Sequence, residues 1–389
     1  MVRVFRDEEK LSPEYVPRSL PHREGELKLL RTFFSSVISG RSLISTRVIV
    51  SGSVGTGKSA LVKLFGRMAV EEARRRGVEL RFIYVNCRIS RTVFTILKRV
   101  VEQLRVRVPE RGYSNEELFH KLLDYIEERN IYTIVALDEV ESLLSKEGGE
   151  ALYFFSRAGE ERVKIPRIST IFIVRNPEIF EMLDKSIRSS LLGNMIHLSE
   201  YSSSQLYDIV RFRASEAFYP DVLMDDSLKL IADLAGERGD ARYALDMLWR
   251  AGKYAEADDS PKVTPEHVRR AAASIYPAIR REHLEYLSPH EKLILLALTR
   301  ALDGGKQAYV TTSELNDHYR MICEEYRVKP RGYTSFWESL QRLDDLGIIR
   351  VNVKSEGSRG RRSYISLPGI PVSILKRELE SILEREKIS

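Results

Sequence analysis

A short glycine-rich segment, residues 52–59, constrains the fold of this chain more than any other part of its sequence. It reads GSVGTGKS and fits G-x-x-x-x-G-K-[ST], a pattern whose backbone N–H groups surround phosphate oxygens. Its glycines let the backbone turn tightly, and the start of a following helix attracts negative charge. Residues 43–52 read as a short buried strand, and an amphipathic pattern follows the segment. We therefore predict a strand, a phosphate-binding loop and a helix in succession.

The residue types in this loop suit nucleotide chemistry. We expect Lys58 to contact the β and γ phosphates, and the Ser59 hydroxyl to be a ligand of Mg²⁺. Further contacts are expected along the loop from Gly55, Thr56, Gly57 and Ala60. The predicted cofactors are therefore ATP or ADP with Mg²⁺. The alternative is a chance glycine-rich loop, and the flanking strand and helix disfavour it.

Three further runs are predicted to be strands, and one of them contains two adjacent carboxylates. The runs are 81–87, 132–144 and 168–180. Asp138 and Glu139 follow the apolar part of the second run. Downstream of a phosphate-binding loop, we interpret Asp138 as the carboxylate that holds Mg²⁺ through water and Glu139 as the one that polarises the attacking water. The alternative is an acidic helix start, where Asp and Glu are also favourable.

Asn176 ends the third of these runs, directly before Pro177. It is a candidate for orienting the attacking water, and the alternative is a plain turn residue, since Asn-Pro commonly starts turns. Strands and helices alternate through this part of the chain. We therefore predict an α/β fold with a mostly parallel sheet and ligands at the C-terminal ends of its strands.

After a further predicted strand at 195–201 the pattern becomes helical. Helices are predicted at 203–218, 226–237, 240–257 and 265–280. Asp240 is expected to cap the third helix, which places Arg242 in its first turn as a candidate for a γ-phosphate contact; a solvated arginine is the alternative. Tyr201 and Arg213 are candidates for contacts with adenine and phosphates, with structural roles as the alternative.

The C-terminal region is predicted to hold three helices and a basic hairpin. The helices cover 288–302, 311–326 and 333–347, and two strands then flank a loop with Gly357 and Gly360. This order is typical of a winged helix, whose third helix enters the major groove while the hairpin contacts an adjacent groove or phosphates. In that helix we expect Phe336, Leu340 and Leu343 to be buried, and Thr334, Ser335, Glu338, Gln341 and Arg342 to face outward.

The net charge of +6 is concentrated in two stretches. Residues 327–362 hold nine Lys/Arg and four Asp/Glu, and residues 88–111 hold seven Lys/Arg and two Asp/Glu. In the hairpin, arginines among flexible Gly and Ser suit a minor groove; the candidates are Lys354, Arg359, Arg361 and Arg362. The alternative is a solvated hairpin on a protein-binding winged helix. Much of 93–104 has an apolar helix face, which we expect to be core.

Composition excludes several classes of protein. Cys87 and Cys323 lie far apart and outside any C-x-x-C, which rules out a disulfide scaffold and a cysteine-based metal site. The first residues, MVRVFRDEEK, lack the apolar core of a signal peptide, and no apolar run is long enough to span a membrane. We therefore expect a cytoplasmic, nucleoid-associated protein.

These segments together resemble the archaeal replication-initiator AAA+ ATPases, relatives of the eukaryotic origin-recognition complex and its helicase-loading partner. GSVGTGKS matches the family's Walker A motif, LDE its Walker B motif and Asn176 its sensor 1 position. GDARYALDML resembles its sensor 2, which carries over Arg242. SEYSSSQLYDIVRFRASEAF resembles the segment where the family's lid meets ATP, which carries over Tyr201 and Arg213. The run VFRDEEKLSPEYVPRSLPHREGELKLL looks like the family's segment over the adenine.

The resemblance implies an architecture of three parts: an AAA+ P-loop base at 1–200, a helical lid at 201–282 and a winged-helix domain at 283–389. It also implies a DNA-contacting helical insertion within 88–125, for which the candidate residues are Arg105, Arg107 and Arg111. Two contact regions on one duplex would let a monomer grip and bend it.

One position departs from the family pattern. The family typically has an arginine ahead of a pair of small residues, as in LDPRVKSSL, whereas this chain reads LDKSIRSSL. Ser186 stands at that position, and Arg188 follows two residues later. If the family's arginine acts on a neighbour's ATP, this chain either lacks it or uses Arg188. Hydrolysis within one chain needs only the other motifs, and we expect it to be slow.

The resemblance implies an ATP-dependent initiator that binds origin duplex DNA and helps to recruit the replicative helicase. Paralogous initiators on adjacent sites are further expected partners. Two other functions fit the same residues. One is a nucleotide-switched transcriptional regulator that uses the same winged helix. The other is a clamp-loader-like or signalling ATPase whose winged helix binds protein.

Overall fold

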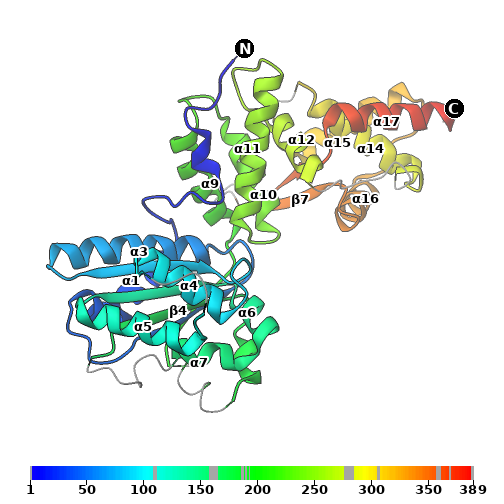
Figure 1. Ribbon diagram of the computed structural model, residues 1–389. Coiled ribbons are helices and arrows are strands. Elements are labelled where there is room, and N and C mark those ends of the chain that lie inside the picture. The colour runs from blue at the N-terminus through cyan, green and yellow to red at the C-terminus, as the bar shows by residue number, and fades with distance from the viewer. Residues whose placement is uncertain are drawn as a thin grey trace. The chain divides into compact units, whose positions relative to one another are not determined.

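The computed structural model describes residues 2–107, 112–156, 165–184, 188, 191, 193–275, 284–304, 307–355, 361–367 and 369–386. The chain forms two compact units, one from Val16–Tyr201 and the other from Met1–Tyr15 together with Ser202–Ser389. Their elements are labelled in Figure 1. Among the helices of the described ranges, none is long and apolar enough to cross a membrane.

A five-stranded parallel sheet forms the centre of the first unit. Its strands are β1 (Arg47–Gly52), β2 (Leu80–Asn86), β3 (Tyr132–Asp138), β4 (Ile168–Val174) and β5 (Met195–Leu198), in the order β2-β3-β4-β1-β5. Every neighbouring pair is parallel, so all the strands end at the same edge. Ligands bind at that edge in sheets of this kind. It carries the glycine-rich loop after β1 and Asp138 at the end of β3.

Helices cover both faces of the sheet. One face packs against α1 (Glu24–Phe33), α2 (Ser35–Ile38) and α3 (Lys58–Arg75). The other packs against α4 (Val93–Gln103), α5 (Asn115–Glu128), α6 (Val140–Glu147), η2 (Gly149–Leu152) and α7 (Tyr153–Ser156). Successive strand residues enter opposite cores, as Ala136 and Leu137 do in β3. Burial on both faces explains why the strands read as continuous apolar runs.

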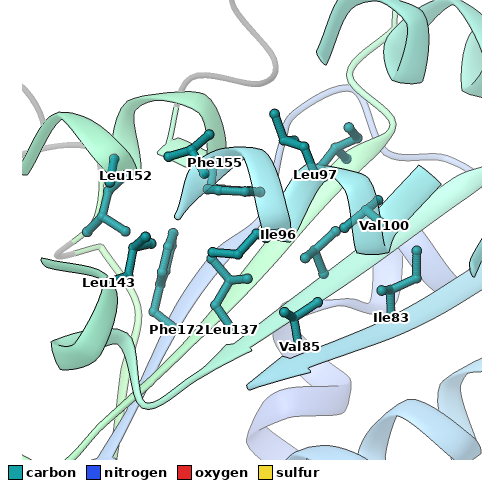
Figure 2. Close-up of a cluster of buried hydrophobic side chains, with 14 of the residues drawn as sticks. Ile83, Val85, Ile96, Leu97, Val100, Leu137, Leu143, Leu152, Phe155 and Phe172 are labelled. Carbon is teal, nitrogen blue, oxygen red and sulfur yellow. The ribbon is translucent and has the colours of Figure 1, made fainter. Parts of the chain in front are cut away.

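Figure 2 shows the core beneath α4. Ile96, Leu97 and Val100 of that helix are fully buried and pack with Val85 of β2 and Leu137 of β3. The expectation that the apolar face within 93–104 is core is therefore confirmed.

The second unit begins with a helical part made of α9 (Ser203–Ala217), α10 (Asp225–Gly236), α11 (Ala241–Ala257) and α12 (Pro265–Ile275). The N-terminal segment, with η1 (Glu8–Leu11), packs on it. The ring centroids of Phe5 and Phe218 are 4.6 Å apart, and the Tyr219 N–H donates to the Val4 carbonyl at 3.1 Å. The first fifteen residues thus join this unit, which differs from the expected grouping of 1–200 as one part.

The rest of the second unit is a winged helix. Its elements are α14 (Pro289–Ala301), β6 (Val310–Thr311), α15 (Thr312–Glu325), α16 (Tyr333–Asp345), β7 (Arg350–Ser355), β8 (Arg361–Ser366) and α17 (Val372–Arg385). The strands form an antiparallel sheet in the order β6-β8-β7. Phe336, Leu340 and Leu343 are fully buried in a single core, as predicted. The α/β class of the first unit and the winged helix are both confirmed.

A buried ion pair joins the helical part of the second unit to its winged helix. Arg269 of α12 is fully buried and lies 3.3 Å from Glu266. Its guanidinium also donates to the carbonyls of Gln307 at 3.0 Å and Ala308 at 3.2 Å. Glu266 in turn accepts the N–H of Val372 at 3.0 Å. Both charged residues are thus bonded to the backbone of the winged helix.

A second set of contacts lies nearer the hairpin. The Tyr309 hydroxyl donates to Asp233 of α10 at 2.6 Å, and the Asn352 amide donates to the same carboxylate at 3.4 Å. Arg350, the first residue of β7, pairs with Glu237 at 2.5 Å. Glu237 directly follows α10 and belongs to the turn that leads to Arg242. This turn and the first strand of the hairpin are therefore in direct contact.

Several element bounds differ from the predictions. β1 begins at Arg47, not at residue 43. The predicted strands at 132–144 and 168–180 end at Asp138 and Val174, because the chain continues as α6 and as η3 (Pro177–Met182). Val140 and Leu143 of α6 are buried, so the apolar run in the sequence extends past the end of β3 into α6. The predicted helix at 265–280 is α12 as far as Ile275, and its remainder lies outside the described residues.

Candidate nucleotide site and DNA interface

The loop after β1 needs glycine at two positions. Gly52 has φ +149° and Gly57 has φ +89°, a region that disfavours side chains. A Cβ on Gly52 would lie 2.5 Å from the Leu198 carbonyl, and one on Gly57 would lie 3.0 Å from the Tyr201 hydroxyl. The loop is therefore packed against the end of β5 and against Tyr201, and α3 begins directly after it at Lys58.

Two polar side chains of the loop donate hydrogen bonds to backbone carbonyls of the same loop. The Lys58 ammonium donates to the carbonyls of Gly52 and Ser53, both at 2.6 Å. The buried Thr56 hydroxyl donates to the Ser53 carbonyl at 2.9 Å. Lys58 thus places its charge at the loop, where a nucleotide phosphate would compete with uncharged carbonyls for it. Gly55 has φ +80°, and Ala60 lies in the first turn of α3.

The loop and the acidic strand end meet through their side chains. The Ser59 hydroxyl donates to Oδ2 of Asp138 at 2.6 Å, and the Tyr84 hydroxyl donates to the same oxygen. The other oxygen, Oδ1, accepts the backbone N–H of Glu139 at 2.8 Å. Glu139 has φ +54° and begins α6. This uncommon backbone conformation turns the chain sharply between the two adjacent carboxylates.

The surroundings of Asp138 disfavour further negative charge. Burial, and then the charge of Asp138, raise the pKa of Tyr84 above its ordinary value, so its hydroxyl remains a proton donor. Burial and the same carboxylate raise the pKa of the Cys87 thiol to about 12. The thiolate is therefore scarce at neutral pH, and Cys87 is a poor nucleophile.

One hydroxyl and one carboxylate fit magnesium chemistry. Mg²⁺ usually takes few protein ligands and keeps several waters, with phosphate oxygens completing its shell. Ser59 would bind the ion directly, and Asp138 would accept a hydrogen bond from a water on it. A bound Mg²⁺ would neutralise charge on the phosphates.

Asn176 caps a short helix at the same edge of the sheet. Its Oδ1 accepts the Glu178 N–H at 3.0 Å, and its amide nitrogen donates to the Glu178 carboxylate at 2.8 Å. These bonds match the turn alternative that the sequence offered. Asn176 follows the end of β4, the strand next to β1, and its action on a water stays a prediction.

Arg23 is part of the site, and the motifs did not single it out. It is 3% exposed, and its Nε donates to the Tyr201 hydroxyl at 2.8 Å and to the Thr56 carbonyl at 3.2 Å. Its guanidinium also donates to the Ser199 carbonyl at 2.5 Å and pairs with Glu26. Arg23, which directly precedes α1, therefore links the start of that helix, the phosphate-binding loop and the segment after β5. A lone arginine in PHREGE gave no spacing signal that could have revealed this role.

Tyr201, Arg213 and Arg242 differ in their surroundings. Tyr201 is 4% exposed and its hydroxyl lies at Gly57. Arg213 of α9 is buried, stacks 5.0 Å from the Tyr15 ring centroid and donates to the Lys10 carbonyl. Burial lowers its pKa, and an arginine nonetheless stays charged. Arg242 is exposed in the first turn of α11, which the Asp240 side chain caps as predicted.

The stretch that departs from the family pattern, residues 183–191, lies only partly within the described residues. Arg188 is exposed, and its N–H donates to the Asp184 carbonyl at 2.9 Å. Ser186 lies outside the described residues. Both alternatives for the family's arginine therefore stay as predictions.

The basic stretch of the first unit presents its charges at the surface. Arg105 and Arg107 are exposed beyond the end of α4, and Arg105 has φ +59°. Arg111 lies outside the described residues. Arg88 and Arg91 are exposed as well, in the turn between β2 and α4. The apolar face of α4 is in the core, so the surface of this stretch is mainly basic, with the exposed Ile89 among its arginines.

The third helix of the winged helix has the expected polar face. Thr334 is exposed and Ser335 is half-buried. Arg342 is 65% exposed and lies 3.5 Å from Glu291, so its charge is partly balanced within the protein. The N-cap of α16 is Gly332, which offers no side-chain cap. The first N–H groups of α16 are thus suited to a phosphate.

The basic residues of the hairpin lie opposite each other. Lys354 pairs with Arg362 and Ser355 with Arg361 in the register of β7 and β8. Arg362 is exposed; Arg359 lies outside the described residues, as do the side chains of Lys354 and Arg361. Like charges directly opposite are unfavourable in a sheet. Hydrogen bonds with Thr311, and also the charge of Arg362, lower the pKa of the Glu314 carboxyl, so part of the Arg362 charge is balanced within the winged helix.

A basic turn before α16 was not among the candidates. Arg327, Lys329 and Arg331 are exposed and lie between α15 and α16. Their alternation with Val328 and Pro330 was visible in the sequence and could have pointed to this turn. Together with Tyr333, which is 59% exposed, they extend the charged surface to the start of α16.

Comparisons with known proteins match all three regions of the chain. A model of the AAA domain matches residues 46–183, a model of the Cdc6 AAA+ ATPase-type lid domain matches 207–273, and a model of the CDC6 C-terminal winged helix domain matches 282–376. The ORC1-type DNA replication protein 2 of Saccharolobus solfataricus is 37% identical over 374 residues, which are 94% of this chain and 91% of that protein.

Solved structures give the same result. Cdc6p from Pyrobaculum aerophilum is similar with a TM-score of 0.87 and 28% identity, over 98% of this chain and 99% of that one. The ORC1 protein of Aeropyrum pernix, solved in complex with DNA, is similar with a TM-score of 0.64 and 31% identity, over 100% and 98%.

Proposed function

The chain belongs to the archaeal ORC1/Cdc6-type family of DNA replication proteins, and on this premise we propose an ATP-dependent initiator that binds origin duplex DNA. Its fold is an AAA+ domain, a Cdc6-type lid and a C-terminal winged helix. In this proposal, nucleotide binds with Mg²⁺ at the loop between β1 and α3. DNA binds the winged helix and the basic stretch at 88–111, and the bound protein helps to recruit the replicative helicase.

The contact between Ser59 and Asp138 supports the nucleotide part of the proposal. It brings a magnesium-type hydroxyl and carboxylate together at the end of a parallel sheet, beside a lysine and a glycine-rich loop. We propose that Lys58 and the loop N–H groups bind the phosphates, and that Glu139 and Asn176 act on the attacking water. Arg242, Tyr201 and Arg213 are proposed to respond to the γ-phosphate and the adenine side. Hydrolysis would be slow without an arginine from a neighbour.

The observation that carries the DNA part is the opposed register of Lys354 and Arg362 in the hairpin. This register sets two basic residues at the same level of the hairpin, where a phosphate backbone could be bound by both strands. The exposed basic turn and the uncapped start of α16 lie in the same winged helix. A protein-binding winged helix has no need for this concentration of positive charge. The DNA-bound relative, ORC1 of Aeropyrum pernix, supports the same conclusion.

The contacts within the second unit support a coupling of the two activities. The turn between α10 and α11 leads to Arg242 in the first turn of α11, and it also holds Glu237, the ion-pair partner of Arg350 in β7. We propose that a shift of this turn on nucleotide binding is passed to the hairpin. The regulator alternative has the same coupling and differs in the DNA that it selects.

A fragment selection tests this function. The full chain is mixed with duplex fragments of its own genome, and retained fragments are sequenced with ATP and with ADP. The proposal predicts enrichment of a few short sites at replication origins. Enrichment at promoters throughout the genome would favour the regulator, and no enrichment over input would favour the signalling ATPase.

A further inference from the structure

Tyr84 is a half-buried tyrosine beside the proposed magnesium ligands, and the family motifs assign it no part. It belongs to β2, which pairs with β3, and the residue opposite it is Ala136, two positions before Asp138. Its hydroxyl donates to Oδ2 of Asp138, the oxygen that also accepts from Ser59. The phenol must be the donor in this bond, because an ionised carboxylate can only accept.

The hydrogen bonds of Asp138 can be counted. A carboxylate offers about four acceptor positions, two on each oxygen. In the described part of the chain, Ser59 and Tyr84 use those of Oδ2 and the Glu139 N–H uses one on Oδ1. One position on Oδ1 is then left for an outside donor. A hydroxyl that binds a metal through its oxygen still donates its proton, so Ser59 can keep this bond while it serves as a ligand.

The ring of Tyr84 is itself held in place. The Lys63 ammonium lies 4.3 Å from the ring centroid, in the geometry of a cation–π contact. Lys63 is one helical turn after Ser59 on α3. The helix that supplies the metal-binding hydroxyl therefore also fixes the tyrosine that orients the carboxylate. The arrangement joins α3, β2 and β3 around one oxygen atom.

We propose that Tyr84 is a positioning residue for the magnesium ion: it holds the Asp138 carboxylate in the orientation that leaves Oδ1 available to a metal-bound water. This rests on the proposed nucleotide site. Without the Tyr84 hydroxyl, Oδ2 keeps only the Ser59 bond and the carboxylate is held less firmly, so the site binds Mg²⁺ less well while it still binds the nucleotide. Partners of this kind, which bond to a group that holds a metal, typically change metal affinity by roughly 10–100-fold.

The experiment compares Tyr84→Phe with the full-length parent. Binding of a fluorescent ADP is measured first in EDTA and then at rising Mg²⁺. Tyr132→Phe is the matched control, since it removes a tyrosine hydroxyl bond of 3.0 Å to the Gly40 carbonyl at the other end of the neighbouring strand. Ser59→Ala is the positive control, because it removes the proposed metal ligand.

We expect Tyr84→Phe to bind ADP in EDTA within about twofold of the parent and to need roughly tenfold more Mg²⁺ for the same gain in affinity. Tyr132→Phe should match the parent in both measurements. A Mg²⁺ requirement that Tyr84→Phe leaves unchanged would overturn the proposal, as would an equal loss of affinity with and without Mg²⁺, which indicates a packing role. If the parent binds ADP but gains nothing from Mg²⁺, the magnesium site fails along with Tyr84, and if the parent binds no ADP at all, the nucleotide site itself fails.

Discussion

Ser59 and Asp138 lie 79 residues apart in the sequence, and their side chains meet in a hydrogen bond of 2.6 Å. The bond joins the start of α3 to the end of β3 across the edge of the sheet. Serine and aspartate are both common residues. Their side chains suit magnesium binding here because they lie in contact beside Lys58. This contact is the geometric basis of the nucleotide site.

The first prediction concerns Lys58. Lys58→Ala removes the cation nearest the proposed phosphates, and we expect ADP affinity to fall by roughly 10–100-fold, since hydrogen bonds to charged groups contribute about 1.5–3 kcal/mol. Lys28→Ala, which removes an exposed charge from α1, is the control for net charge. Titration of both variants with a fluorescent ADP measures the effect. Equal affinity in Lys58→Ala and the parent would contradict the phosphate-loop assignment.

The second prediction concerns the hairpin. Changing Arg361 and Arg362 to alanine should weaken duplex binding and lower the slope of log affinity against log salt by roughly 0.9 for each phosphate that the hairpin no longer binds. Arg377 and Arg385 of α17 are exposed, and the same double change there alters net charge equally. Fluorescence anisotropy over a range of salt gives both slopes. If the hairpin variant keeps the parent slope, the hairpin does not contact phosphates.

The third prediction separates two adjacent arginines of α12. Arg269→Met leaves the half-buried Glu266 without its ion-pair partner and removes the donor to the Gln307 and Ala308 carbonyls, and should destabilise the second unit by about 3 kcal/mol. Arg270→Met, whose partner Asp258 is 40% exposed, should cost less than about 1 kcal/mol. Both tryptophans, Trp249 and Trp337, lie in the second unit, so their fluorescence in urea reports its unfolding. Equal losses in the two variants would argue against this account of the buried pair.

The fourth prediction is a loss of stability of the second unit in acid. Burial lowers the pKa of His267, and its Nδ1 accepts the Thr264 N–H at 3.0 Å, so the folded state holds the neutral ring. As pH falls below the ordinary value of about 6.5, the unfolded chain binds a proton first, and stability decreases toward the lowered folded pKa.

His267→Gln is the matched variant for this prediction, since glutamine at that position can accept the same N–H without titrating. We expect the urea midpoint of the parent to be lower at pH 5.5 than at pH 7.5, and the difference to be smaller in the variant. Identical differences in both proteins would assign the effect to other groups.

The sequence predicted the parts of this fold that depend on local pattern. The lid helices follow their amphipathic periods closely, and Asp240 caps α11 as its position before the helix suggested. The ends of β3 and β4 were wrong because an apolar run continues into α6 and into η3 without a change of composition. The first helix and α17 were not predicted.

The residues of the candidate site also include some that the sequence revealed and some that it did not. The Walker residues were identifiable because a loop motif has fixed spacing, and their approach follows from a parallel sheet. Arg23 and Tyr84 were missed because each acts on a residue far away in the sequence, through a hydroxyl or a carbonyl that no spacing rule connects. The grouping of residues 1–15 with the lid depends on long-range packing of Phe5 on Phe218, which the sequence pattern does not encode.

We expect this chain to bind origin DNA through its winged helix and through residues 88–111. A footprint at a candidate origin of its own genome, with ATP and with ADP, reports on both regions at once. The footprint should be a short protected site, with the Arg361 and Arg362 double variant losing protection on one side and an Arg105 and Arg107 double variant losing it on the other. A parent protein that leaves the duplex unprotected in both nucleotides would contradict it.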